Sequence, residues 1–319
     1  MTSVAPPSEK AIRREGAQRM GFFTDTTTCI GCKACEVACK QWNDLPSDGG
    51  ELLPGSSYDN TRELGAATWR HVRFVEVAAP PIPGGSEEID LLAVASGGAT
   101  LERWVFMSDV CKHCTNAGCL DACPTGALIR TEFDTVIVQP DVCNGCGYCI
   151  PSCPFGVIDR DPDDGRAAKC TLCYDRLEDG MEPACAKACP TDSIQFGTRD
   201  ELVDRAERRV ATLQDRGVES AYLYGVDEEM AGGLGAFFLL TEAPERYGLP
   251  ANADSPIQEQ VVPATAASVA AGITAAAATA AAMLTARGPS ARFPPVLAAV
   301  AIGAAATDLA AEMIKRRRR

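Results

Sequence analysis

The chain has 319 residues, and its 43 acidic against 30 basic side chains give a formal net charge of −13 at neutral pH. This acidity argues against a nucleic-acid partner and leaves no uniformly basic face for docking on a membrane. The length allows two domains, and all sixteen cysteines lie between Cys29 and Cys189.

Residues 1–22 are predicted to form a flexible N-terminal arm. The pair Arg13-Arg14 is similar to a twin-arginine signal, but polar residues follow it instead of the apolar stretch that such a signal requires. We therefore expect no cleavable signal, and we expect the arm to lie on a partner or on the rest of the chain.

Four groups of four cysteines follow. Two groups have the spacing C-x2-C-x2-C-x3-C, one has C-x2-C-x4-C-x3-C, and one has C-x2-C-x11-C-x3-C. In chain order the groups are Cys29, Cys32, Cys35 and Cys39; Cys111, Cys114, Cys119 and Cys123; Cys143, Cys146, Cys149 and Cys153; and Cys170, Cys173, Cys185 and Cys189. The first spacing is typical of ferredoxins, in which three thiolates bind one [4Fe–4S] cluster and the fourth binds the neighbouring cluster. The sequence therefore predicts four [4Fe–4S] clusters.

Disulfides and structural zinc are the alternatives. A chain of this length can bury a core without disulfides, and three cysteines within seven residues suit a metal better than a bridge. Zinc ribbons separate two C-x2-C pairs by a dozen or more residues, a description that only the fourth group fits. A zinc-stapled interaction scaffold without a redox role is thus the second hypothesis.

Short strands are predicted between and after the cysteine groups. Residues 69–77 alternate in polarity and are expected to pair with 101–107, and residues 127–130 and 135–138 are expected to form a hairpin. Residues 156–158 and 193–196 are the predicted strands after the third and fourth groups. The last two cysteines of each group are four residues apart, which predicts a helical turn that presents both on one face.

The predicted fold class is α+β, with two ferredoxin-like modules, one nested in the other, over residues 23–198. Crossed ligation within the modules gives four ligand sets: Cys29, Cys32, Cys35 and Cys189; Cys39, Cys170, Cys173 and Cys185; Cys111, Cys114, Cys119 and Cys153; and Cys123, Cys143, Cys146 and Cys149. Pairing the first group with the second and the third with the fourth remains an alternative.

The phrases at residues 29–39, 109–114, 141–149 and 169–176 resemble the electron-transfer beta subunit of formate dehydrogenase. Further likeness lies at residues 58–61, 68–72 and 237–250, so that the resemblance covers about residues 21–250. One departure from the ferredoxin pattern is Lys40, where proline follows the last cysteine of the other groups. Four-cluster subunits of other molybdopterin reductases and of some hydrogenases share the cysteine pattern, and they remain alternatives.

The resemblance implies a partner subunit with a molybdenum or tungsten pterin site that oxidises formate to carbon dioxide. It also implies a downstream acceptor, such as a membrane cytochrome subunit. The chain itself is expected to relay electrons without substrate chemistry, since it has neither a glycine-rich dinucleotide turn nor a P-loop.

Lysines beside the cysteines could raise the reduction potentials of clusters. Lys169 lies in one of the resembling phrases and is the candidate for this role, whereas Lys33 and Lys112 could equally be solvated side chains. His113 is expected to be a structural residue of the cluster loop, and His71 a structural residue of a strand.

Two segments follow the cysteine-bearing part. Residues 199–257, with a predicted helix at 201–216, are expected to form an extension that packs on partners, and residues 258–319 are expected to form an alanine-rich helical tail.

The uncharged stretch 263–286 is long enough to cross a bilayer, and the basic residues after it predict a cytoplasmic C-terminal end. The alternatives are a hairpin with residues 294–307 and soluble helices docked on a partner. We expect membrane association through this span, with export of the cysteine-bearing part alongside a partner favoured over a cytoplasmic location.

Overall fold

The computed structural model describes residues 18–47, 61, 63–78, 101–257 and 262–285. The chain divides into two compact units at Ser255 and Pro256. Most of the predicted arm at 1–22 and the uncharged stretch at 294–307 lie outside the described residues.

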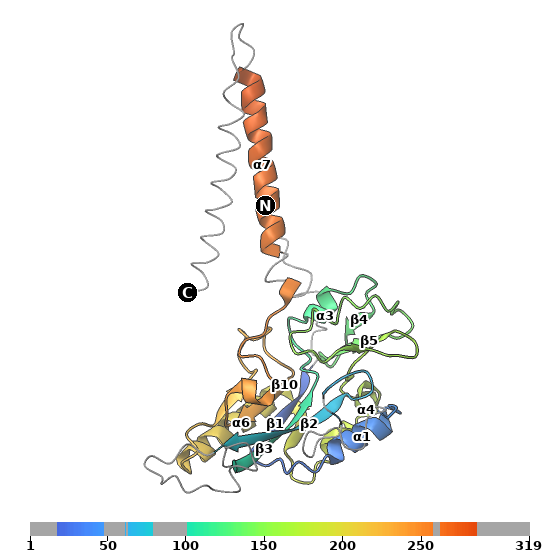
Figure 1. The fold of residues 1–319 in the computed structure, drawn as a ribbon, viewed down its shortest axis with the longest axis vertical. Coiled ribbons are helices and arrows are strands. Elements are labelled where there is room, and N and C mark those ends of the chain that lie inside the picture. The colour runs from blue at the N-terminus through green and yellow to red at the C-terminus, as the bar shows by residue number, and fades with distance from the viewer. Residues whose placement is uncertain (1–17, 48–60, 62, 79–100, 258–261, 286–319) are drawn as a thin grey trace, which may run out of the picture. The chain divides into compact units, whose positions relative to one another are not determined.

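A four-stranded mixed sheet joins distant parts of the first unit. Its order is β8 (Ile194–Thr198), β1 (Met20–Asp25), β10 (Ala236–Leu240) and β9 (Tyr222–Tyr224), as Figure 1 shows for β1 and β10. β1 pairs in parallel with β10 and antiparallel with β8. Around the start of β1 the backbones approach so closely that a Cβ at Gly21 would lie 2.1 Å from the backbone oxygen of Gly235. Glycine is therefore required where β1 begins.

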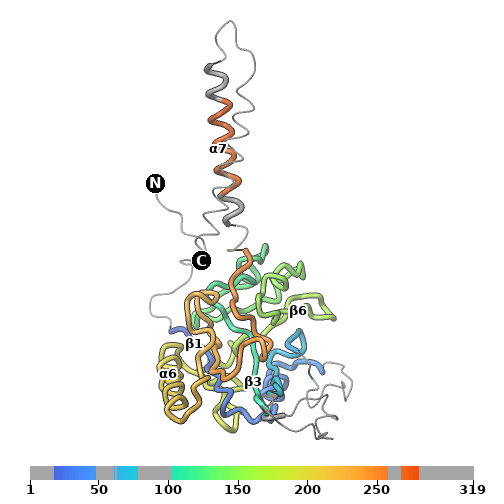
Figure 2. The backbone as a smooth tube through the Cα atoms, turned by 60° about the vertical axis from the view of Figure 1, so that its left-hand side comes forward, coloured from blue at the N-terminus to red at the C-terminus, as the bar shows by residue number. Residues whose placement is uncertain are grey.

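Helix α6 (Arg199–Asp215) covers one face of this sheet (Figures 1 and 2). Its buried side chains Leu202, Ala206 and Leu213 form a cluster with Phe23 and Phe237, whose rings stack at 5.5 Å. Side chains alternate across a strand, so the neighbouring Phe22 belongs instead to the core that contains the cysteines. The sheet thus separates an apolar layer under α6 from the cysteine-bearing core. The predicted helix at 201–216 is confirmed.

Three two-stranded sheets complete the first unit. They pair β2 (Arg70–Ala78) with β3 (Leu101–Val110), β4 (Leu128–Arg130) with β5 (Val136–Val138), and β6 (Asp159–Arg160) with β7 (Ala167–Ala168). The first two pairs confirm the predicted partners 69–77 with 101–107 and the predicted hairpin. The strand predicted at 156–158 is wrong: Val157 and Ile158 are buried in irregular backbone, and pairing begins only at Asp159.

The remaining helices of the first unit are short: α1 (Ala34–Trp42), α3 (Gly118–Asp121), α4 (Tyr174–Glu178), α5 (Ala184–Lys187) and the 3-10 helix η1 (Pro244–Tyr247). Only α1 contains both of the last two cysteines of its group, Cys35 and Cys39. In the third group these two cysteines lie in consecutive turns instead of a helix.

The segments predicted as a head (23–198) and an extension (199–257) share one sheet. β8 and the second half of β1 come from the former, and β9 and β10 come from the latter. The first half of β1, Met20–Phe22, belongs to the predicted arm, which is therefore wrong as a flexible segment at these residues. Ser255, at the end of the unit, is fully buried and contacts the Asp121 carboxylate at 3.4 Å. The extension therefore contributes to the core of this unit.

The second unit contains α7 (Val262–Thr285), which matches the helix expected in the alanine-rich tail. In the part of the chain that the structure describes, no helix is both long enough and apolar enough to cross a membrane. The predicted span at 263–286 is therefore unsupported. Alanine, which predominates in α7, is only weakly apolar.

We expect a chain that ends after Ser255 to retain the fold of the first unit, because its core and sheet lie entirely upstream. A matched chain that ends after Asp215 should aggregate, since it lacks β9 and β10, leaves one edge of β1 unpaired and removes the Phe237 ring from Phe23. Size-exclusion chromatography and circular dichroism under anaerobic conditions would compare the two. Equal behaviour of both chains would contradict this account of the core.

Candidate metal centres

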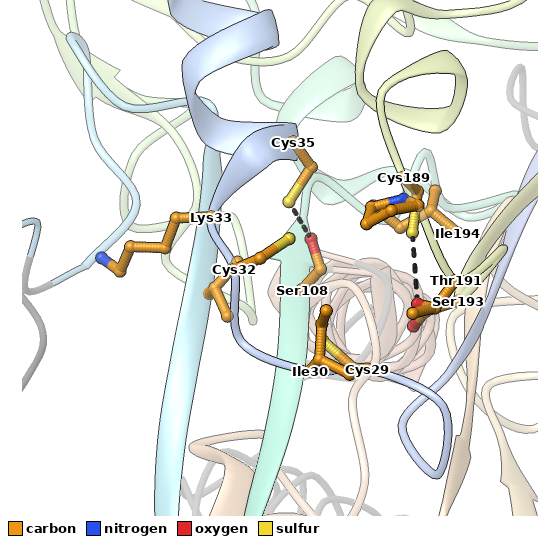
Figure 3. A pocket seen from close by; sticks show the side chains of 12 residues that line it. Cys29, Ile30, Cys32, Lys33, Cys35, Ser108, Cys189, Thr191, Ser193 and Ile194 are labelled. Carbon is orange, nitrogen blue, oxygen red and sulfur yellow. Dashed lines mark hydrogen bonds between the residues drawn. The ribbon is translucent and has the colours of Figure 1, made fainter.

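Four cysteines from the two ends of the cysteine-bearing segment line one cavity. Cys29, Cys32, Cys35 and Cys189, here called quartet A, surround about 280 Å³ of space that is partly open to solvent (Figure 3). Ser108 Oγ lies 3.2 Å from Cys35 Sγ, and Thr191 Oγ1 lies 3.8 Å from Cys189 Sγ. Hydroxyl groups thus stand beside two of the four sulfurs.

A second cavity has the same construction. Cys111, Cys114, Cys119 and Cys153, here called quartet C, surround about 340 Å³ together with apolar residues such as Phe155 and Val157. Cys111 directly follows β3 and Cys119 lies in α3, while Cys153 is the last cysteine of the third group. The second and third groups therefore meet in one cavity.

The remaining cysteines form two further sets. Burial is the main cause of the raised pKa of Cys39, and the adjacent thiolates Cys170, Cys185 and Cys173 add to the rise. We call Cys39, Cys170, Cys173 and Cys185 quartet B. Burial likewise raises the pKa of Cys149 to about 11, with a further contribution from Cys123, Cys143 and Cys146. These four form quartet D.

Electrostatic interactions between cysteines of different quartets follow the order A–B–C–D. Burial and the neighbouring Cys185 of quartet B raise the pKa of Cys35 in quartet A. Cys111 of quartet C likewise contributes to the raised pKa of Cys170 in quartet B. Cys149 of quartet D in turn contributes to the raised pKa of Cys119 in quartet C.

The two ends of the series reach the surface. Cys32 in quartet A and Cys146 in quartet D are exposed, whereas all four cysteines of quartet B are buried. A charge that enters at one end could therefore leave at the other after it passes through a buried interior.

The cavities of quartets A and C each gather four cysteines, three from one group and one from another. This donor set fits a [4Fe–4S] cluster, which takes four thiolates in the crossed ferredoxin arrangement. His113 lines the cavity of quartet C, and its buried Nε2 has no hydrogen-bond partner in the described chain. A group that fills the cavity could satisfy this atom.

Comparisons with known proteins agree with the cysteine chemistry. Residues 28–127 and residues 102–199 each match a family described as a 4Fe-4S dicluster domain. A formate dehydrogenase iron-sulfur subunit from Haemophilus influenzae is 44% identical over 253 residues, which are 78% of this chain and 73% of that protein. The chain belongs to the iron–sulfur subunits of formate dehydrogenase.

Two further relatives belong to another formate dehydrogenase and to a different reductase. The iron-sulfur subunit of the nitrate-inducible formate dehydrogenase of Escherichia coli is 41% identical, over 78% of this chain and 77% of that protein. The B subunit of the anaerobic dimethyl sulfoxide reductase of Escherichia coli is 33% identical, over 57% of this chain and 75% of that protein. The chain is thus an electron-transfer subunit of the molybdopterin oxidoreductase type, and its sixteen cysteines fit four [4Fe–4S] clusters.

Lys169 lies fully buried between quartets B and C of this iron–sulfur subunit. Its ammonium group donates to the backbone oxygens of Val136 and, at 2.8 Å, of Cys170, and it lies 3.6 Å from Cys111 Sγ. Burial disfavours the charged lysine, but the nearby thiolates more than offset this cost and raise the pKa of Lys169. The residue singled out by the sequence therefore stands beside two sets of cysteines.

Arg70 is a second buried cation, and the sequence analysis missed it. Arg70 is the first residue of β2 and is 1% exposed. Its Nη2 lies 3.1 Å from Cys185 Sγ of quartet B. Burial disfavours its charge, yet the thiolates of Cys185, Cys35, Cys170 and Cys39 together raise the pKa of Arg70. The alternation in residues 69–77 could have revealed it, because period two places Arg70 on the same face as the buried Val72.

Two other lysines have carboxylate partners. Lys33 extends away from the cysteines of quartet A (Figure 3) and forms an ion pair with Glu36 at 3.4 Å. Lys112 is fully buried, but it pairs with Asp109 and lies over the rings of Phe155 and Phe238. The charge of Lys112 is thus neutralised locally.

Each of the two histidines has a hydrogen-bond partner at Nδ1. His113 Nδ1 accepts a hydrogen bond from the Val136 amide at 3.1 Å, which fixes its ring on the cysteine loop. Burial, followed by the positive charges of Lys169 and Arg130, lowers the pKa of His113 well below its usual range. His71 contacts Thr61 Oγ1 at 3.0 Å.

We expect Lys112→Met to destabilise the first unit by about 3–5 kcal/mol, because it leaves the buried Asp109 carboxylate without its cation. The double variant Asp109→Asn with Lys112→Met removes both charges and should recover most of this loss. Denaturant unfolding followed by circular dichroism measures the difference. If the double variant is as unstable as the single one, the ion pair is not the cause.

Proposed function

We propose that this chain carries one [4Fe–4S] cluster on each of quartets A, B, C and D. In this proposal the chain relays electrons from a molybdenum or tungsten pterin subunit that oxidises formate to an acceptor subunit. The observation that carries it is the unbroken series of quartets between two exposed ends. It includes the nested arrangement predicted from the sequence, with quartets A and B enclosing C and D.

Crossed ligation follows from this assignment. Each quartet combines three cysteines of one group with one of another, as ferredoxin-type ligation requires. Cys189 stands with the first group in the cavity of quartet A, and Cys153 stands with the second group in that of quartet C. Both neighbourhoods favour the nested pairing over pairing of groups in chain order.

The chemistry divides between the subunits. Formate oxidation releases one carbon dioxide, one proton and two electrons. We assign the bond-breaking step and the proton to the catalytic subunit, and only the electrons to this chain. When bound, a [4Fe–4S] cluster accepts and releases one electron at a time, so the two electrons pass in sequence. The role of the chain's own residues is to bind the clusters, exclude water and set the potentials.

The exposed ends supply the docking surfaces. At the quartet A end, Ile30 lines the cavity and is 58% exposed, and Val37 on α1 is 62% exposed. Val142 and Tyr148, which are 44% and 63% exposed, flank Cys146 at the quartet D end. Apolar and aromatic side chains beside an exposed ligand are the residues that a partner would cover. We assign one end to the catalytic subunit and the other to the acceptor, a cytochrome subunit or an equivalent protein.

The function predicts that the chain, purified anaerobically with its catalytic subunit, contains about sixteen iron and sixteen sulfide per copy, at four of each per cluster. Formate should bleach its visible absorbance, whereas acetate should not. A sample without the catalytic subunit should bleach with dithionite but not with formate. A colourless protein that contains zinc would establish the scaffold hypothesis instead.

Crossed ligation predicts which cluster each cysteine variant affects. Cys153→Ala should change the same electron paramagnetic resonance signal as Cys111→Ala, because both belong to quartet C. Cys123→Ala should instead match Cys143→Ala, through quartet D. Titration with dithionite, followed by this spectroscopy, compares the four variants. If Cys153→Ala matches Cys143→Ala, each group binds its own cluster.

A further inference from the structure

The guanidinium group of Arg70 is held rigidly at the junction of quartets A and B. Nη1 donates to the backbone oxygen and to Oγ of Ser108, both at 3.3 Å, and Nη2 points to Cys185 Sγ at 3.1 Å. The group stacks over the Phe22 ring, 4.7 Å from its centroid. Its Nε has no hydrogen-bond partner in the described chain.

No carboxylate among the described residues forms an ion pair with Arg70, although the side chain is 1% exposed. A buried cation is costly unless negative charge lies nearby. The groups around it that become negative when they bind a metal are cysteine thiols, above all Cys185 and Cys35. Lys112 provides the contrast, because Asp109 neutralises it at a similar depth.

We propose that Arg70 sets the reduction potential of the cluster on quartet B and makes this cluster easier to reduce than the one on quartet A. The inference rests on the proposed function, since it requires the clusters. It adds an energetic order to the relay: electrons that enter at quartet A meet a favourable step to quartet B.

The charge balance explains the direction of the effect. One electron that moves from the cluster of quartet A to that of quartet B carries one negative charge toward Arg70. A fixed positive charge stabilises the more negative, reduced state, and a low-dielectric interior strengthens this attraction. Arginine suits the role because its guanidinium group stays protonated.

Geometry favours quartet B over quartet A as the main target. Arg70 contacts a sulfur of quartet B directly, whereas it reaches Cys35 of quartet A through Ser108, whose Oγ lies 3.2 Å from that sulfur. Lys169 supplies a second positive charge on the other side of quartet B, where it donates to the Cys170 backbone oxygen at 2.8 Å. At quartet A, by comparison, Lys33 extends away from the cysteines and is paired with Glu36.

The test is a redox titration of the full-length chain with its catalytic subunit, monitored by electron paramagnetic resonance. Cys39→Ser and Cys29→Ser identify the signals of quartets B and A by altering them. In Arg70→Gln, which keeps an amide donor but lacks the charge, the ratio of reduced to oxidised cluster B at a fixed potential should fall about tenfold or more. A tenfold fall corresponds to about 59 mV for a one-electron couple. Arg70→Lys should retain most of the original ratio.

Iron content separates the outcomes. Wild-type protein without four clusters would contradict the proposed function itself. Full iron content in Arg70→Gln with an unchanged midpoint potential for cluster B, or an equal shift in Arg70→Lys, would overturn the role of the Arg70 charge. If Arg70→Gln fails to fold, the wild-type titration still decides, because cluster B must be reduced at a higher potential than cluster A. The reverse order would overturn the inference.

Discussion

The first unit holds all sixteen cysteines and buries eight of them, which concentrates thiol groups where a negative charge is hard to accommodate. Burial raises the pKa of Cys35, Cys119 and Cys170 to about 12, so that these thiols are protonated in the absence of metal. A metal must displace those protons to bind, and it then holds the thiolates in an interior that excludes water. Arg70 and Lys169 are buried cations that have no carboxylate partner among the described residues, and both lie beside cysteine sulfurs. The negative charge of metal-bound thiolates offsets the cost of burying these two cations.

The sheets bring the cysteines to their positions. Each group begins shortly after a strand: Cys29 after β1, Cys111 after β3, Cys143 after β5 and Cys170 after β7. Strand pairing fixes where each strand ends, and therefore where the first sulfur of each group lies. β1 and β8 are neighbours in the sheet. Cys29, which follows β1, and Cys189, which precedes β8, can therefore line the same cavity although they are 160 positions apart in the chain. The nested order that we propose for the quartets follows from this sheet topology.

The C-terminal part of the first unit has a structural role that its lack of cysteines conceals. β10, fully buried, lies between β1 and β9 and continues the sheet on the side opposite β8. α6 covers the face that carries Phe23 and Phe237. The opposite face carries Phe22, on which the Arg70 guanidinium stacks. An apolar framework that includes the cysteine-free C-terminal part of the first unit therefore positions the Arg70 cation beside quartet B.

The sequence by itself determined the cysteine chemistry and much of the local structure. Ligand spacing is a local property, so C-x2-C-x2-C-x3-C indicated the cluster type. Alternation located β2, and short apolar runs located β3 and the β4–β5 hairpin. Residues 156–158 misled the prediction because a short apolar run reads alike in a strand and in buried irregular backbone. Only the tertiary structure decided that residues 199–255 belong to the same compact unit as the cysteines, because the β1–β10 pairing joins segments about 210 residues apart. It likewise decided that Arg70, rather than Lys33 or Lys112, stands uncompensated beside a sulfur, since the partner of a buried charge is chosen by packing in space and not by position in the chain.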